Sequence, residues 1–161
     1  MVKRKGFTLI ELVFTMVIIA TLAAVVMVAM GGHIANANEK ATIRSIEQIY
    51  EAAVAWASTQ TPVCYQTGPA STNPVPGTPV SPAELVAGGF LRAGAVNAAG
   101  TINNAFGGAI TIAPAAAPDQ CNQVLITVTG IPAASGARLL QLYTQKADAA
   151  AFAGGTLTLT Y

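Results

Sequence analysis

One carboxylate stands inside a long apolar stretch near the start of the chain, and charge pairing is the chemistry that its position suggests. Glu11 lies in the run from Phe7 to Met30, and no other charged side chain occurs between Glu11 and Glu39. A charge near the middle of a hydrocarbon span costs ~2.5–3.5 kcal/mol on insertion scales, so it indicates a functional role. Glu11 lies four residues after Phe7, about 6 Å of helix, where this cost is smaller.

Gly6 and Phe7 stand directly before Thr8-Leu9-Ile10 and Glu11, and a basic segment, Lys3–Lys5, precedes them. This arrangement resembles the leader and N-terminal segment of type IV pilins and of their relatives, the type II secretion pseudopilins. In that family a prepilin peptidase cuts after the glycine, and the new N-terminal residue, usually phenylalanine, is N-methylated. The resemblance implies that residues 1–6 are a leader, that Phe7 carries the methylated amine, and that Glu11 is the assembly glutamate.

Cleavage after Gly6 would create a positive amine at Phe7, and this amine is a suitable partner for Glu11. A neighbouring subunit offset by about one helical turn can place its amine beside the carboxylate. In a dry filament core of low effective dielectric, the two opposite charges attract strongly, whereas either charge alone is costly. We therefore expect the pair to fix the axial register between subunits.

The 24 residues from Phe7 to Met30 are long enough to cross a membrane as one helix. They span roughly 36 Å, which exceeds the ~30 Å hydrocarbon core of a bilayer. The basic residues before the run favour a cytoplasmic N-terminus and place everything after Met30 across the membrane. A plain signal anchor with an incidental glutamate has the same basic region and apolar run. The position of Glu11 after Gly6 and Phe7 favours the pilin-like interpretation.

The absence of proline from Phe7 to Ser58 predicts one helix of about fifty residues, roughly 75–80 Å long. Residues 7–30 are apolar on all sides, as a membrane span or a filament core requires. Residues 31–60 are amphipathic, and we expect Tyr50 and Trp56 to pack in a core. The apolar positions of this second half recur at three- and four-residue spacing, which predicts a helix laid against a domain: Ile43, Ile46, Tyr50, Ala53, Val54 and Ala57.

Two consecutive glycines, Gly31 and Gly32, lie where the apolar and amphipathic halves of the predicted helix meet. Each costs about 1 kcal/mol relative to alanine in a helix interior. We therefore expect the hinge of the long helix at this pair. The neighbouring His33 is expected to be an interfacial polar residue rather than a ligand.

Residues 61–161 are expected to form a globular head. A proline-rich loop covers Thr61–Pro82. A short helix is expected to start at Ser81, with Glu84 completing a capping box, and to end at Gly88-Gly89.

The rest of the head shows an alternating pattern that is typical of antiparallel strands. Residues rich in threonine, valine, isoleucine and leucine alternate with period two over 110–112, 124–129 and 156–161. Apolar residues between Ala133 and Lys146 predict a helix before the last strand. The expected fold class is therefore α+β, type IV pilin-like, with the long helix packed on a small antiparallel sheet.

Cys64 and Cys121 are the two cysteines of the chain. An even pair in a small domain of an oxidising compartment most often forms one disulfide. A bridge between them would tie the proline-rich loop to the sheet. Two buried free thiols are the alternative.

The chain has few residues suited to catalysis. Its single histidine is His33, and the acids after Glu51 are Glu84, Asp119 and Asp148. No Ser-His-Asp set, metal-ligand cluster or phosphate loop is present in the sequence. We therefore expect no enzyme activity, no cofactor and no metal site. Removal of the leader leaves five basic against seven acidic side chains, so no direct binding of nucleic acid is expected.

The resemblance implies the major structural subunit of a type IV pilus, with helices bundled in the core and heads outside. The expected partners are further copies of the chain, the prepilin peptidase and methyltransferase, and the pilus assembly machinery of the inner membrane. The membrane would hold the precursor, and the mature protein would reach the cell surface in an extracellular pilus. A minor pilin or a type II secretion pseudopilin is the alternative within the family. A membrane-anchored binding domain that never polymerises is the alternative from another class.

Overall fold

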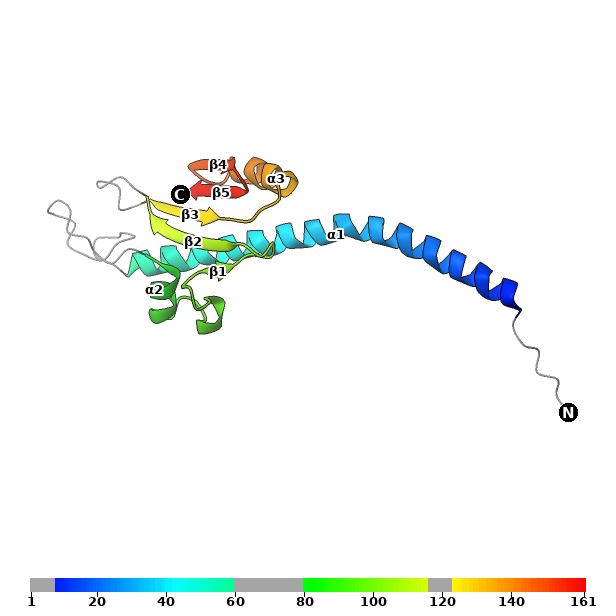
Figure 1. Ribbon diagram of the computed structural model, residues 1–161. Coiled ribbons are helices and arrows are strands. Elements are labelled where there is room, and N and C mark those ends of the chain that lie inside the picture. The colour runs from blue at the N-terminus through cyan, green and yellow to red at the C-terminus, as the bar shows by residue number, and fades with distance from the viewer. Residues whose placement is uncertain (1–7, 60–79, 116–122) are drawn as a thin grey trace. The chain divides into compact units, whose positions relative to one another are not determined.

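The computed structural model describes residues 8–59, 80–115 and 123–161 (Figure 1). The chain divides into two compact units, residues 1–37 and 38–161. Four of the site residues expected from the sequence lie outside the described residues: Gly6, Phe7, Cys64 and Cys121. Cleavage, methylation and the disulfide therefore stay predictions.

Helix α1 runs from Leu9 to Ser58 and has 50 residues, which confirms the single long helix expected from the sequence. The helix continues through Gly31 and Gly32, and a Cβ added at either position would meet no atom within 4 Å. The helix is thus unbroken at the expected hinge. Bending there stays a prediction, because two glycines still lower the local stability of a helix.

The second unit contains a five-stranded antiparallel sheet in the order β1-β2-β3-β5-β4. A long helix beside a small antiparallel sheet is the α+β fold that the sequence predicts. The strand bounds are Ile102–Asn103 for β1, Ala109–Pro114 for β2, Val124–Val128 for β3, Ala149–Ala153 for β4 and Thr156–Thr160 for β5.

The core of the second unit lies between the sheet and the second half of α1, which run side by side in Figure 1. Every second residue of the three inner strands points into this core, as the alternating pattern predicts. The buried strand residues are Ile110, Ile112, Val124, Ile126, Val128, Leu157 and Leu159.

The buried stripe of α1 overlaps in part with the expected stripe: Ile46, Ala53 and Ala57 are buried, and Ile43 and Tyr50 are partly buried. Val54 is 41% exposed, so its assignment to the core is wrong. Ile49 is buried instead, and with Ile46 and Ala53 it forms a row at three- and four-residue spacing. Trp56 is buried among these residues, which confirms its role in the core.

Helix α2 (Pro82–Ala87) begins and ends where the sequence predicts. Its N-cap is Ser81, whose Oγ accepts a hydrogen bond from the backbone N–H of Glu84 at 3.2 Å. Gly88 follows the last helical residue, and Gly89 adopts φ +80°, a conformation that favours glycine. A single 3₁₀ turn, η1 (Ala93–Ala95), comes next.

Helix α3 (Ala133–Tyr143) confirms the helix expected before the last strand, and it packs on strand β4, which the sequence pattern did not predict. A Cβ added at Gly136 would lie 2.0 Å from Cζ of Phe152. The absence of a side chain at Gly136 therefore lets the phenylalanine of β4 lie against the helix.

The turn between β1 and β2 is organised by Asn104, a buried polar residue. Its Oδ1 accepts from the backbone N–H groups of Phe106 at 2.8 Å and Gly108 at 3.0 Å. Its Nδ2 donates to the carbonyl of Thr129 at 2.6 Å, just beyond the end of β3. The side chain of Asn104 thus supplies hydrogen-bond partners to the backbone of the turn and links the turn to the neighbouring strand. Its own polar atoms are paired as well, which a buried polar group requires.

Candidate functional site

Glu11 lies in the first turn of α1, where the structure holds its backbone but leaves its carboxylate accessible. The carbonyl of Thr8 accepts from the backbone N–H groups of Glu11 at 3.1 Å and Leu12 at 3.3 Å. The hydroxyl of Thr8 donates to Glu11 Oε2 at 3.5 Å, at the long end for a hydrogen bond. A carboxylate is also favoured here by the positive end of the helix dipole.

The carboxylate of Glu11 has no cationic partner among the described residues, where the two ion pairs recorded join other side chains. Its side chain is exposed. A positive group from outside the chain can therefore approach it without displacing an existing pair.

The apolar side chains that follow Glu11 are exposed on every side of the helix. Leu9 is 82% exposed, Phe14 64% and Val28 84%, and no residue from Leu9 to Met30 is buried. By length and composition α1 is apolar enough to cross a membrane. A surface of this kind requires cover, which a bilayer or further apolar helices can supply.

Residues 1–30 match the family model described as "Prokaryotic N-terminal methylation motif". A search of curated proteins and a search of solved structures gave no match to the chain. The family match confirms the type IV pilin-like leader recognised in the sequence and supports a type IV pilin-like or pseudopilin protein. The motif implies processing by a prepilin peptidase and handling by a pilus or secretion assembly machinery.

Two ion pairs join α1 to α3 and to the residues that follow α3, within the second unit. Arg138 Nη1 lies 3.3 Å from Glu39 Oε1, and Lys146 Nζ lies 3.1 Å from Glu47 Oε1. The side chain of Glu39 is only 13% exposed, whereas both members of the second pair are about half exposed. Since exposed pairs contribute little, the Glu39–Arg138 pair is the more important of the two for the position of α3.

Three tyrosines gather where α1, α3 and the end of β5 meet. The rings of Tyr50 and Tyr161 stack with centroids 4.3 Å apart. Tyr143 is buried, and its hydroxyl has no hydrogen-bond partner among the described residues. Burial raises the pKa of Tyr143, and the charges that Tyr161 and Glu47 carry raise it further. Burial first, and then Tyr50 and Glu47, raise the pKa of Tyr161 to about 12.

These raised pKa values predict a loss of stability at alkaline pH. Tyrosine in an unfolded chain ionises near pH 10, whereas the folded pKa of Tyr161 is about 12 and that of Tyr143 is also raised. Above pH 10 the unfolded state therefore loses protons first, and the free energy of unfolding falls as the pH rises toward 12. Below pH 10 these two groups contribute no pH dependence.

Tyr143→Phe tests this prediction, because it removes one titrating group and a hydroxyl that has no hydrogen-bond partner in the part of the chain that the structure describes. We expect the free energy of unfolding at pH 7 to stay within about 1 kcal/mol of wild type or to rise. Between pH 10 and 12 we expect the free energy of unfolding of the variant to fall less steeply than that of the wild type. Thermal unfolding of the full chain in detergent, followed by near-ultraviolet circular dichroism, measures both. An identical alkaline slope in the two proteins would contradict the prediction for Tyr143.

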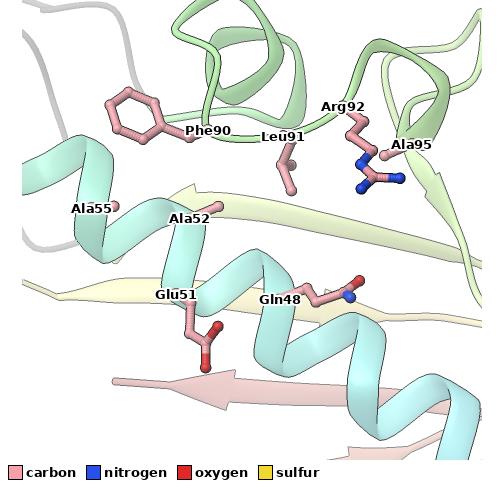
Figure 2. A pocket seen from close by; sticks show the side chains of 8 residues that line it. All are labelled: Gln48, Glu51, Ala52, Ala55, Phe90, Leu91, Arg92 and Ala95. Carbon is pink, nitrogen blue, oxygen red and sulfur yellow. The ribbon is translucent and has the colours of Figure 1, made fainter.

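A groove of about 430 Å³ lies between the second half of α1 and the segment that follows α2 (Figure 2). Ala52 and Ala55 line it from α1, and Leu91 points toward them from the opposite wall. Arg92 and Gln48 also line it, and Arg92 has no ion pair among the described residues. The sequence reasoning missed this groove, because its walls come from segments that are forty residues apart in the chain. The groove is lined by three alanines, by the larger apolar side chains of Phe90 and Leu91, and by the polar side chains of Gln48, Glu51 and Arg92.

No three histidine, cysteine, aspartate or glutamate side chains come together as metal ligands within residues 8–59, 80–115 and 123–161. His33 lies on α1 and is exposed. Among the expected site residues that are described, only Glu11 therefore has chemistry suited to binding a partner.

Proposed function

We propose that this chain is the major structural subunit of a type IV pilus. One observation carries the proposal: an accessible Glu11 lies in the first turn of an apolar helix that is exposed on all sides, within the 30 residues that match the methylation motif. The match to the methylation motif supports a pilin-like protein, and the assignment to the major subunit is our inference.

In this proposal the leader, residues 1–6, is removed after Gly6, and the new amine at Phe7 is methylated. The apolar helix holds the precursor in the inner membrane. During assembly the amine of an incoming subunit pairs with Glu11 of a neighbour, while apolar helices bury one another in the filament core. The pair is strong there, because water is excluded and the effective dielectric is low.

The head, residues 61–161, would form the outer surface of the pilus at the cell exterior. A disulfide between Cys64 and Cys121 would close the proline-rich loop against the sheet. A bridge of this kind restricts the unfolded chain and typically adds about 2–4 kcal/mol of stability. Gly31 and Gly32 would permit a bend between the filament core and the head.

The first test is the mass and N-terminus of the dominant protein sheared from cells. We expect an abundant species that begins at methylated Phe7 and is two hydrogens lighter than its reduced form. If the chain occurs only in the membrane fraction and is processed, it is a pseudopilin or minor pilin. If residues 1–6 are still attached there, it is a simple membrane anchor, and the proposed function is wrong.

A further inference from the structure

The second unit has an unprotected edge strand at one end of its sheet. Strand β4 pairs only with β5, so its other edge has no strand partner among the described residues. The five residues of β4 are four alanines and Phe152, with no proline or charge that would discourage pairing. Ala149, Ala151 and Ala153 are exposed. The strand therefore exposes a row of small side chains, and its outer edge has no partner strand among the described residues.

Asp148 directly precedes this strand and is exposed. It forms no ion pair among the described residues, where the pairs are Glu39–Arg138 and Glu47–Lys146. A carboxylate thus stands beside a row of methyl groups. The groove described above carries the opposite charge, because Arg92 lies at its side next to Ala95, while Ala52 and Ala55 line the wall that α1 forms.

The groove and the β4 segment lie near opposite edges of the sheet. The groove is formed by the segment after α2, which leads into edge strand β1, whereas β4 is the other edge. Figure 1 shows α2 and β1 on one side of the second unit and β4 on the other. Two different, complementary patches on one chain make a heterologous contact, which can repeat from copy to copy without closing.

We propose that the groove of one subunit receives the β4 segment, residues 148–153, of a neighbouring subunit, with Asp148 beside Arg92. This inference rests on the proposed function, because it concerns how heads meet once copies assemble. Glu51 also lines the groove, but Figure 2 shows its carboxylate directed away from the segment of Arg92, so it leaves that position open to an acid.

The size of the groove sets the strength of the contact. A stable interface between two proteins involves about 20–30 residues on each side, and the groove is lined by only eight. The contact therefore forms only between subunits already held together by their helices. It adds rigidity and register to the outer layer of the filament.

Charge reversal tests the contact in cells that express the full chain. Arg92→Glu or Asp148→Arg alone places like charges together, and each is expected to lower the yield of sheared filaments about tenfold. The double variant restores the opposite charges in reversed order and is expected to return the yield to near wild type. Gln141→Arg, which adds a charge at an exposed position of α3, is the matched control and is expected to have no effect.

The outcomes distinguish a failure of the proposed contact between heads from a failure of the proposed function. Rescue in the double variant supports the contact. Normal filaments from both single variants, or impaired filaments from all three, overturn it while leaving the proposed function intact. If the wild-type chain gives no filaments, the proposed function is wrong, and the contact falls with it.

Discussion

Glu11→Ala is expected to abolish incorporation of the chain into filaments while leaving cleavage after Gly6 intact. The substitution removes the only acid in the apolar half of α1, so the amine of each incoming subunit enters the core without a partner. Breaking a buried ion pair in this way costs about 3–5 kcal/mol. That cost lowers the equilibrium constant for adding one subunit by roughly 10²- to 10⁴-fold.

The measurement compares the sheared and membrane fractions of cells that produce the variant, with N-terminal mass analysis of both. We expect a processed chain in the membrane and none in the sheared fraction. Glu11→Gln should behave in the same way, because it keeps the size and polarity of the side chain but removes the charge. Normal filaments from either variant would show that charge pairing does not drive assembly.

Thr21→Ala is the matched control for this experiment. The hydroxyl of Thr21 donates to the carbonyl of Ile18 in its own helix at 2.9 Å, so its proton is already used, and the side chain carries no charge to pair with a neighbour. We expect filament yield to be unchanged. A loss as large as that of Glu11→Ala would mean that any polar change in the apolar segment is damaging.

Gly108→Ala is expected to give the largest loss of stability in the head. An added Cβ at Gly108 would lie 1.9 Å from the carbonyl oxygen of Thr129. That oxygen belongs to the backbone and cannot swing aside as a flexible side chain can. The start of β2 and the end of β3 would have to separate, at a cost of about 3 kcal/mol.

The same shift would disturb the turn of Asn104, which bonds to both Gly108 and Thr129. Thermal unfolding of the purified chain in detergent measures the effect. Gly94→Ala is the control, since a Cβ there would meet no atom within 4 Å and the residue does not have a positive φ. Equal unfolding temperatures for Gly108→Ala and wild type would show that the two strands tolerate a wider separation.

Much of this molecule could be predicted from local sequence patterns. The absence of proline predicted α1, and Ser81 with Pro82 predicted the start of α2. The alternation of Val124, Ile126 and Val128 predicted both a strand and its buried face. These features follow from backbone geometry and from period-two or period-3.6 hydrophobicity, which neighbouring residues alone determine.

Strand β4 could not be predicted in this way. Ala149–Ala153 is nearly all alanine, which favours helix over strand. It is a strand because β5 offers it a partner and because Phe152 packs over Gly136 of α3. Similarly, Val54 and Ile49 are both apolar, and only the position of the sheet decides that Ile49 is the buried one.

The sequence by itself determined the pilin-like leader, the position of Glu11 and the long apolar helix, because each depends on residues adjacent in the chain. Only the tertiary structure decided the order of the strands, the ion pairs that Arg138 and Lys146 make with α1, and the groove beside Arg92. These features join residues that are tens of positions apart. Their contacts form when the core closes, and no local pattern encodes which distant surfaces will then meet.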